Sequence, residues 1–167
     1  MGPISVSRAI DAPRERVFDF LADLANRATF TDHFIGEYRL QRFDSAGVGA
    51  AARMRIARGG LWMETVITEA ERPYRILERG KGGRLDRIPI LTAWELVEGP
   101  GGASSEVTVR FGTEPSHPVD RLYELWRGER YFRRHWSTAL GRLKEMIESG
   151  RPGERVSIAG GARVPVT

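Results

Sequence analysis

A long amphipathic segment near the C-terminus constrains the fold more than any other feature. A helical period of about 100° per residue divides residues 120–148 into an apolar side and an arginine-bearing side. A helix with such a stripe has to cover an apolar surface elsewhere in the chain. The apolar side holds Leu122, Leu125, Phe132, Trp136, Leu140, Leu143 and Ile147, and the opposite side holds Arg127, Arg130 and Arg134.

The chain has a net charge of +4 and a pI near 9.9, which raises the hypothesis that it binds nucleic acid. The arrangement of residues in the same segment argues against this hypothesis. Proteins that bind single strands present basic and aromatic side chains together on one surface. Here the helical period separates them. The arginines are therefore interpreted as a solvated face, and no nucleic-acid partner is expected.

Residues 34–114 have the pattern of a run of short strands separated by turn signals such as Gly59-Gly60 and Gly99-Pro-Gly-Gly102. Ala52, Met54 and Ile56 alternate with arginines, which is typical of a sheet with one dry face and one wet face. Short turns favour antiparallel pairing between neighbours in a meander. A further strand is expected at residues 4–10, followed by two short helical segments.

These patterns predict an α+β fold, in which a curved antiparallel β-sheet wraps around a long C-terminal helix, with two short helices after the first strand. Residues 1–150 are expected to form one ligand-binding domain. Residues 151–167 lack an apolar period and are expected to be disordered. The chain has no cysteine, no secretory leader and no membrane span, so we expect a cytoplasmic protein without integral membrane association.

The order of elements resembles the START-like helix-grip (SRPBCC) superfamily and its polyketide cyclase/dehydrase and lipid-transport branch. The resemblance covers residues 4–148 and is carried by ISVSRAIDAPRERVFDFLADL, GVGAAARMRI, ITEAERPYRILERG, TAWELVEGPGGASSEVTVRF and LGRLKEMIE. These are structural marks rather than a catalytic signature. The resemblance implies a central cavity for a lipid, sterol, polyketide or hormone.

A curved sheet and a straight helix leave space between them, and ligand pockets of this kind are mostly apolar with a few polar groups. Strand parity places Thr92 and Trp94 with Ile90 and Leu96, and Tyr38 with Leu40. Parity is ambiguous for residues 61–67, where both faces carry apolar side chains. The predicted ligand-binding residues are Tyr38, Met54, Thr92, Trp94, Phe132 and Trp136.

Candidate catalytic residues are Glu129, His135 and Tyr38. Glu129 lies near the centre of the apolar stripe, where burial would raise its pKa. Two alternatives are favoured over that role: an ion pair with Arg133 four residues later, or a place in a first helical turn if Gly128 interrupts the helix. His135 lies beside the stripe, where a boundary histidine is the more common outcome.

The sequence predicts neither a metal site nor a cofactor. The three histidines, His33, His117 and His135, are far apart in sequence. Gly47-Val-Gly49-Ala-Ala-Ala52 fits a loose dinucleotide pattern, but a strand-like segment follows it where a phosphate site needs a helix N-terminus.

The leading hypothesis is therefore noncovalent binding of a hydrophobic or amphipathic small molecule in a central cavity. The alternative is a cofactor-independent polyketide cyclase/aromatase or dehydratase that uses acid and base groups in the cavity. Neither the ligand nor the oligomeric state follows from the sequence.

Overall fold

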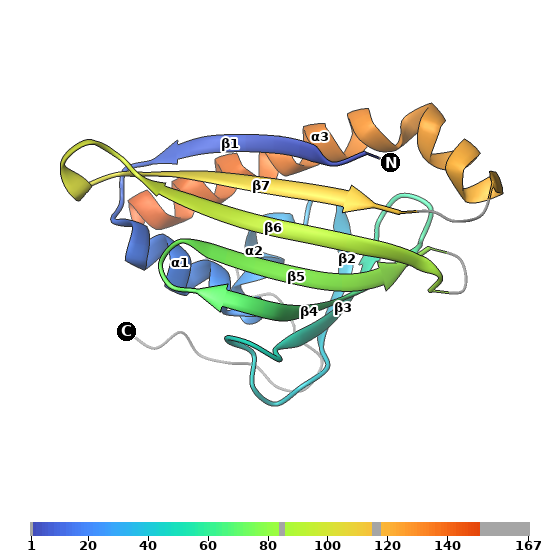
Figure 1. Ribbon diagram of the computed structural model, residues 1–167, viewed down its shortest axis with the longest axis horizontal. Coiled ribbons are helices and arrows are strands. Elements are labelled where there is room, and N and C mark those ends of the chain that lie inside the picture. The colour runs from blue at the N-terminus through green and yellow to red at the C-terminus, as the bar shows by residue number, and fades with distance from the viewer. Residues whose placement is uncertain (1, 84–85, 115–117, 151–167) are drawn as a thin grey trace.

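The computed structural model describes residues 2–83, 86–114 and 118–150, with backbone only for residues 118–127. The expected tail at residues 151–167 and His117 lie outside the described residues. Figure 1 shows one curved sheet with helices along one of its faces, and the long C-terminal helix, α3, runs beside β1. The α+β helix-grip prediction is confirmed.

The sheet has seven antiparallel strands in the order β1-β7-β6-β5-β4-β3-β2. Strands β2 to β7 therefore form the predicted meander, and β1 joins it by pairing with β7. The strand bounds are Ile4–Ile10 (β1), Ile35–Leu40 (β2), Ala51–Ile56 (β3), Trp62–Glu71 (β4), Arg75–Gly82 (β5), Ile88–Glu98 (β6) and Ser105–Thr113 (β7).

Short helical segments connect β1 to β2. They are α1 (Arg14–Ala22), the 3-10 turn η1 (Leu24–Asn26) and α2 (Arg27–Thr31), and a second 3-10 turn, η2 (Pro100–Gly102), precedes β7. The loop before β3 contains Gly47 and Gly49 at φ angles of 75° and 91°, a region that favours glycine. As predicted, this glycine motif leads into a strand and not into a helix.

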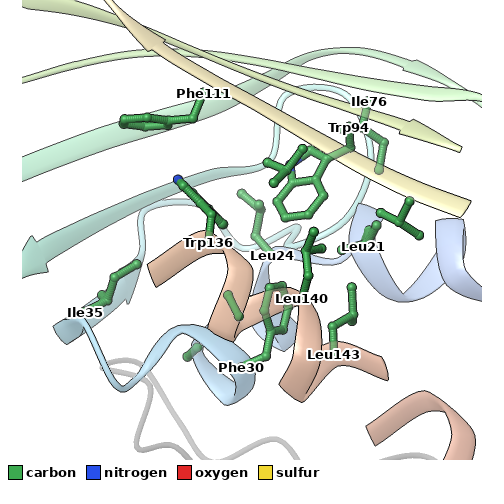
Figure 2. Packing of buried hydrophobic residues seen from close by; sticks show 14 of the residues in the cluster. Leu21, Leu24, Phe30, Ile35, Ile76, Trp94, Phe111, Trp136, Leu140 and Leu143 are labelled. Atoms are coloured by element: carbon green, nitrogen blue, oxygen red, sulfur yellow. The ribbon is translucent and has the colours of Figure 1, made fainter. Parts of the chain in front are cut away.

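Helix α3 (Pro118–Ser149) is continuous through Gly128. The alternative that Gly128 starts a new helix is therefore wrong. The apolar stripe of α3 enters the core through Trp136, Leu140, Leu143 and Ile147, all buried. Figure 2 shows Trp136, Leu140 and Leu143 of α3 in one cluster with side chains of α1, α2 and the sheet, among them Leu21, Phe30 and Trp94.

The structure resolves the ambiguous segment before Ile67. Met63, Thr65 and Ile67 on β4 are buried, whereas Trp62 lies on the opposite face. On that face the centre of the Trp62 ring lies 4.9 Å from the Arg53 guanidinium. This cation–π contact explains why a large apolar side chain is found on the solvent-facing side of the sheet.

Candidate functional site

A cavity of about 30 Å³ lies between the sheet and the helices. Its volume suffices for about one or two water molecules, so side chains fill most of the space between α3 and the sheet. The apolar lining residues are Leu24, Ile35, Met54, Met63, Ile90 and Phe111. Most of the remaining lining residues bring polar groups to the cavity: Arg27, Thr31, Tyr38, Thr65, Glu78, Thr92 and Trp136. Glu64 also borders the cavity, but its carboxylate pairs with Arg53 on the outer face of the sheet.

A buried ion pair forms part of the cavity wall. Nη2 of Arg27, at the start of α2, lies 2.6 Å from Oε1 of Glu78 on β5, and the side chains are only 6% and 5% exposed. Two further donors reach the carboxylate: Trp94 Nε1 at 2.8 Å and Thr65 Oγ1 at 3.0 Å. Burial of a charge is costly unless it is paired and hydrogen-bonded, and this carboxylate has both kinds of partner.

The Arg27 guanidinium also has partners other than Glu78. Its Nε and Nη2 donate to the Leu21 carbonyl at 3.2 and 2.9 Å. Its planar group lies 4.3 Å from the centre of the Trp94 ring, which adds a cation–π contact in the interior. Because these contacts balance the charges locally, the pair contributes polarity to the cavity without a net charge.

Tyr38 and Trp136 bring two further polar atoms to the cavity. Both residues are 6% exposed, and neither the Tyr38 hydroxyl nor the Trp136 Nε1 has a hydrogen-bond partner among the described residues. Burial raises the pKa of Tyr38 well above its ordinary value, so the hydroxyl stays protonated. The two groups belong to different elements, since Tyr38 lies on β2 and Trp136 on α3.

The structure brings four of the six predicted ligand-binding residues together. Tyr38, Met54, Thr92 and Trp136 line the cavity. Trp94 is fully buried beside it, where its indole N–H is engaged by Glu78. Phe132 is partly buried, and its ring packs 4.7 Å from that of Phe111.

Two of the candidate catalytic residues lie outside the cavity lining. The Glu129 side chain is 62% exposed and pairs with Arg133 at 2.8 Å. The predicted ion pair is thus present, and the Glu129 carboxylate is exposed to solvent. His135 is half-buried at the side of α3, where Tyr131 and Phe34 pack against its ring.

His33 and His135 are adjacent, although they are far apart in sequence. Their ring centres are 5.3 Å apart, and His33 Nε2 lies 3.1 Å from the His135 carbonyl oxygen. Burial lowers the pKa of both histidines. Among residues 2–83, 86–114 and 128–150, no group of three or more His, Cys, Asp or Glu side chains could hold a metal ion.

Sequence reasoning missed Arg27, Thr65 and Glu78. Glu78 carried a usable signal, because it shares strand parity with Ile76, which is fully buried. Arg27 carried no such signal in its five-residue helix. In the part of the chain that the structure describes, no helix is both long and apolar enough to cross a membrane.

A known protein family matches nearly the whole chain. The family model described as polyketide cyclase/dehydrase and lipid transport matches residues 1–162. A comparison with curated protein sequences finds no match.

Solved structures share the fold at low sequence identity. TTHA0849 from Thermus thermophilus has a TM-score of 0.68 and 16% identity, with 89% of this chain and 98% of that chain covered. DR_A0006 from Deinococcus radiodurans has a TM-score of 0.60 and 19% identity, with 89% and 99% covered. DynU16, described as a putative protein in the dynemicin biosynthetic locus, has a TM-score of 0.63 and 18% identity. The match covers 91% of this chain but only 49% of DynU16.

Proposed function

The chain belongs to the polyketide cyclase/dehydrase and lipid-transport family, and from this premise we propose that it binds a hydrophobic or amphipathic small molecule in its central cavity. The observation that supports the proposal is the cavity between α3 and the sheet, which combines an apolar lining with a few buried polar groups. Ligand sites commonly have this composition. The proposed ligand is a lipid-, sterol- or polyketide-like molecule. The proposed location of the protein is the cytoplasm.

Ligand entry requires rearrangement, because the cavity measures only about 30 Å³. Met54 and Met63 face one another in the register of β3 and β4, and both line the cavity. Methionine is unbranched and adopts alternative conformations readily. We therefore propose that these two side chains move when the ligand's apolar body enters.

Fluorescence of the neutral apolar probe N-phenyl-1-naphthylamine tests the proposal. The wild-type protein is expected to bind the probe and enhance its emission. Thr92→Phe fills the cavity and should abolish the enhancement, whereas Leu91→Phe, on the exposed face of the same strand, should leave it unchanged. Equal responses from both variants, with both folded by circular dichroism, would place the probe elsewhere and contradict the proposal.

Native mass spectrometry of the freshly purified protein gives an independent test. A small molecule that co-purifies with the wild type and is lost from Thr92→Phe would identify the natural ligand class. A ligand that is retained by Thr92→Phe would contradict binding at this cavity.

A cyclase/aromatase or dehydratase activity is the second candidate. It is favoured by one observation: the Glu78 carboxylate and the protonated Tyr38 hydroxyl line the same cavity. An acid and a base close together are what aldol closure and loss of water require. His135 and Glu129 lie outside the lining and are weaker candidates.

The rate of product formation from a poly-β-ketone analogue separates the two functions. If the chain is a cyclase, Tyr38→Phe and Glu78→Gln should both slow turnover, while the exposed Glu129→Gln should leave it unchanged. Binding of the analogue without turnover by the wild type would exclude cyclisation of this substrate and leave the binding function.

A further inference from the structure

We propose that the cavity selects uncharged ligands bearing a carbonyl-type oxygen, and that the Tyr38 hydroxyl of β2 and the Trp136 indole N–H of α3 bind this oxygen. This inference rests on the proposed function and names the chemical class that the site accepts.

The first argument concerns the two donors. Tyr38 Oη and Trp136 Nε1 are buried, without partners among the described residues, and both residues line the cavity. A buried polar atom without a partner is costly, so each such atom calls for an explanation. Figure 2 shows the Trp136 nitrogen directed away from α3 and toward the sheet. The indole N–H can only donate, so a group that bonds both residues has to be an acceptor.

The second argument concerns charge. Among the described residues that line the cavity, the buried charged side chains are those of Arg27 and Glu78. These two lie 2.6 Å apart and neutralise each other. Glu64, which is more exposed, lies 3.7 Å from Arg53. A carboxylate ligand would therefore enter without a free counter-charge, and the burial of an unpaired charge is strongly unfavourable. A ketone, aldehyde or amide oxygen accepts the same hydrogen bonds without that cost.

The third argument concerns the neighbouring hydroxyls. The Thr65 hydroxyl donates to Glu78 at 3.0 Å, and the Thr31 hydroxyl donates to the Arg27 carbonyl at 2.7 Å. Both hydroxyl hydrogens are therefore used in hydrogen bonds within the protein. The Thr92 hydroxyl is a further polar group of the lining, but the fully buried polar atoms of the lining that lack a partner among the described residues belong to Tyr38 and Trp136.

The test compares three probes of similar shape: acetophenone, ethylbenzene and benzoate. Binding to the full chain, labelled with ¹⁵N at tryptophan, is followed by NMR at the indole N–H signals, and Trp136→Phe identifies the Trp136 signal by its disappearance. Acetophenone should bind most tightly and shift the Trp136 signal downfield. Ethylbenzene should bind more weakly, and benzoate should bind least.

Tyr38→Phe removes only the hydroxyl. The affinity for acetophenone should fall roughly tenfold, as expected for one hydrogen bond, while the affinity for ethylbenzene should stay unchanged. Thermal stability should be equal or higher, because the variant removes an unpartnered buried group. The matched control is Tyr74→Phe, which alters a half-exposed tyrosine outside the lining and should change neither property.

Three outcomes would overturn the inference while the proposed function stands: equal affinities for acetophenone and ethylbenzene, tightest binding by benzoate, or acetophenone affinity that is unaffected by Tyr38→Phe. Loss of stability in Tyr38→Phe with unchanged affinity would assign the hydroxyl a structural role, such as bonding a buried water molecule. No binding by any probe also contradicts the inference. If N-phenyl-1-naphthylamine gives no response either, the proposed function fails with it.

Discussion

Arg27 and Glu78 are separated by 51 positions in the sequence, yet Arg27 Nη2 lies 2.6 Å from Glu78 Oε1 in the interior. The pair joins the start of α2 to β5 and places a full positive and a full negative charge beside the cavity. Trp94 completes the arrangement, because its ring lies against the guanidinium and its N–H bonds the carboxylate. A polar network thus forms within an otherwise apolar core.

Removal of one partner of this pair should be strongly destabilising. Glu78→Leu leaves Arg27 as an uncompensated buried charge and Trp94 Nε1 without its acceptor, so we expect a loss of about 3–5 kcal/mol in the free energy of unfolding. Urea denaturation measures this loss. The double variant Arg27→Met with Glu78→Leu should recover much of it, because an apolar pair replaces the ion pair.

The control for that experiment is an ion pair on the wet face of the sheet. Glu95 lies 3.1 Å from Arg110, with side chains 37% and 56% exposed. Glu95→Leu should change the free energy of unfolding by less than about 1 kcal/mol. A Glu78→Leu effect as small as this would show that the interior pair contributes no more than a surface pair.

The two adjacent histidines should make stability depend on pH. Burial lowers the pKa of His33 and His135 below the ordinary value of 6.5. The unfolded chain therefore takes up protons at a higher pH than the folded chain does. The resulting stability is present above pH 6.5 and is lost as the pH falls from 6.5 through the lower folded pKa values.

Thermal unfolding between pH 7.5 and 5 measures this dependence. His135→Phe retains the ring contacts with Phe34 and Tyr131, so it should flatten the pH profile without unfolding the protein. Charged neighbours that act on the pair are Arg58, Arg134, Arg142 and Asp32. A profile as steep as that of the wild type would show that His135 does not cause the loss.

Two glycines should respond in opposite ways to alanine. A Cβ added to Gly141, within α3, meets nothing within 4 Å, so Gly141→Ala should stabilise the protein by about 0.5–1 kcal/mol through helix propensity. A Cβ on Gly80 would lie 1.8 Å from the Glu64 backbone oxygen on the paired strand. Gly80→Ala should therefore lower the melting temperature, and a rise in both variants would contradict the β4–β5 contact.

The apolar side of α3 can be tested at Leu140, which is fully buried in the core cluster (Figure 2). Leu140→Ala should cost about 2–5 kcal/mol of unfolding free energy, because it removes buried surface and leaves a cavity. Glu145→Ala, on the exposed side of the same helix, should stay within about 0.5 kcal/mol. Similar effects of the two substitutions in urea denaturation would contradict the orientation of the helix.

Periodicity predicted the buried face of α3 from Trp136 onward and the buried face of β6, whereas Glu129, which the helical period placed near the centre of the apolar stripe, is exposed. Trp136, Leu140, Leu143 and Ile147 enter the core as the helical period indicated, and Thr92 and Trp94 face inward as strand parity indicated. The rule gave no answer before Ile67, because Trp62 is apolar and yet packs against arginines on the outer face.

The chain's own pattern therefore determined the class of fold, the order of its elements and, where one face was clearly apolar as in β6, the side that is buried, because a repeat of 2.0 or 3.6 residues is a local property. Tertiary structure alone decided which polar groups meet. Arg27 pairs with Glu78, and the ring of His33 packs against that of His135. Tyr38 and Trp136 line one cavity, where the hydroxyl and the indole N–H have no hydrogen-bond partner among the described residues. Contacts of this kind depend on the curvature of the sheet and on the distance that each side chain spans across the core. No repeat in the sequence indicates either of these.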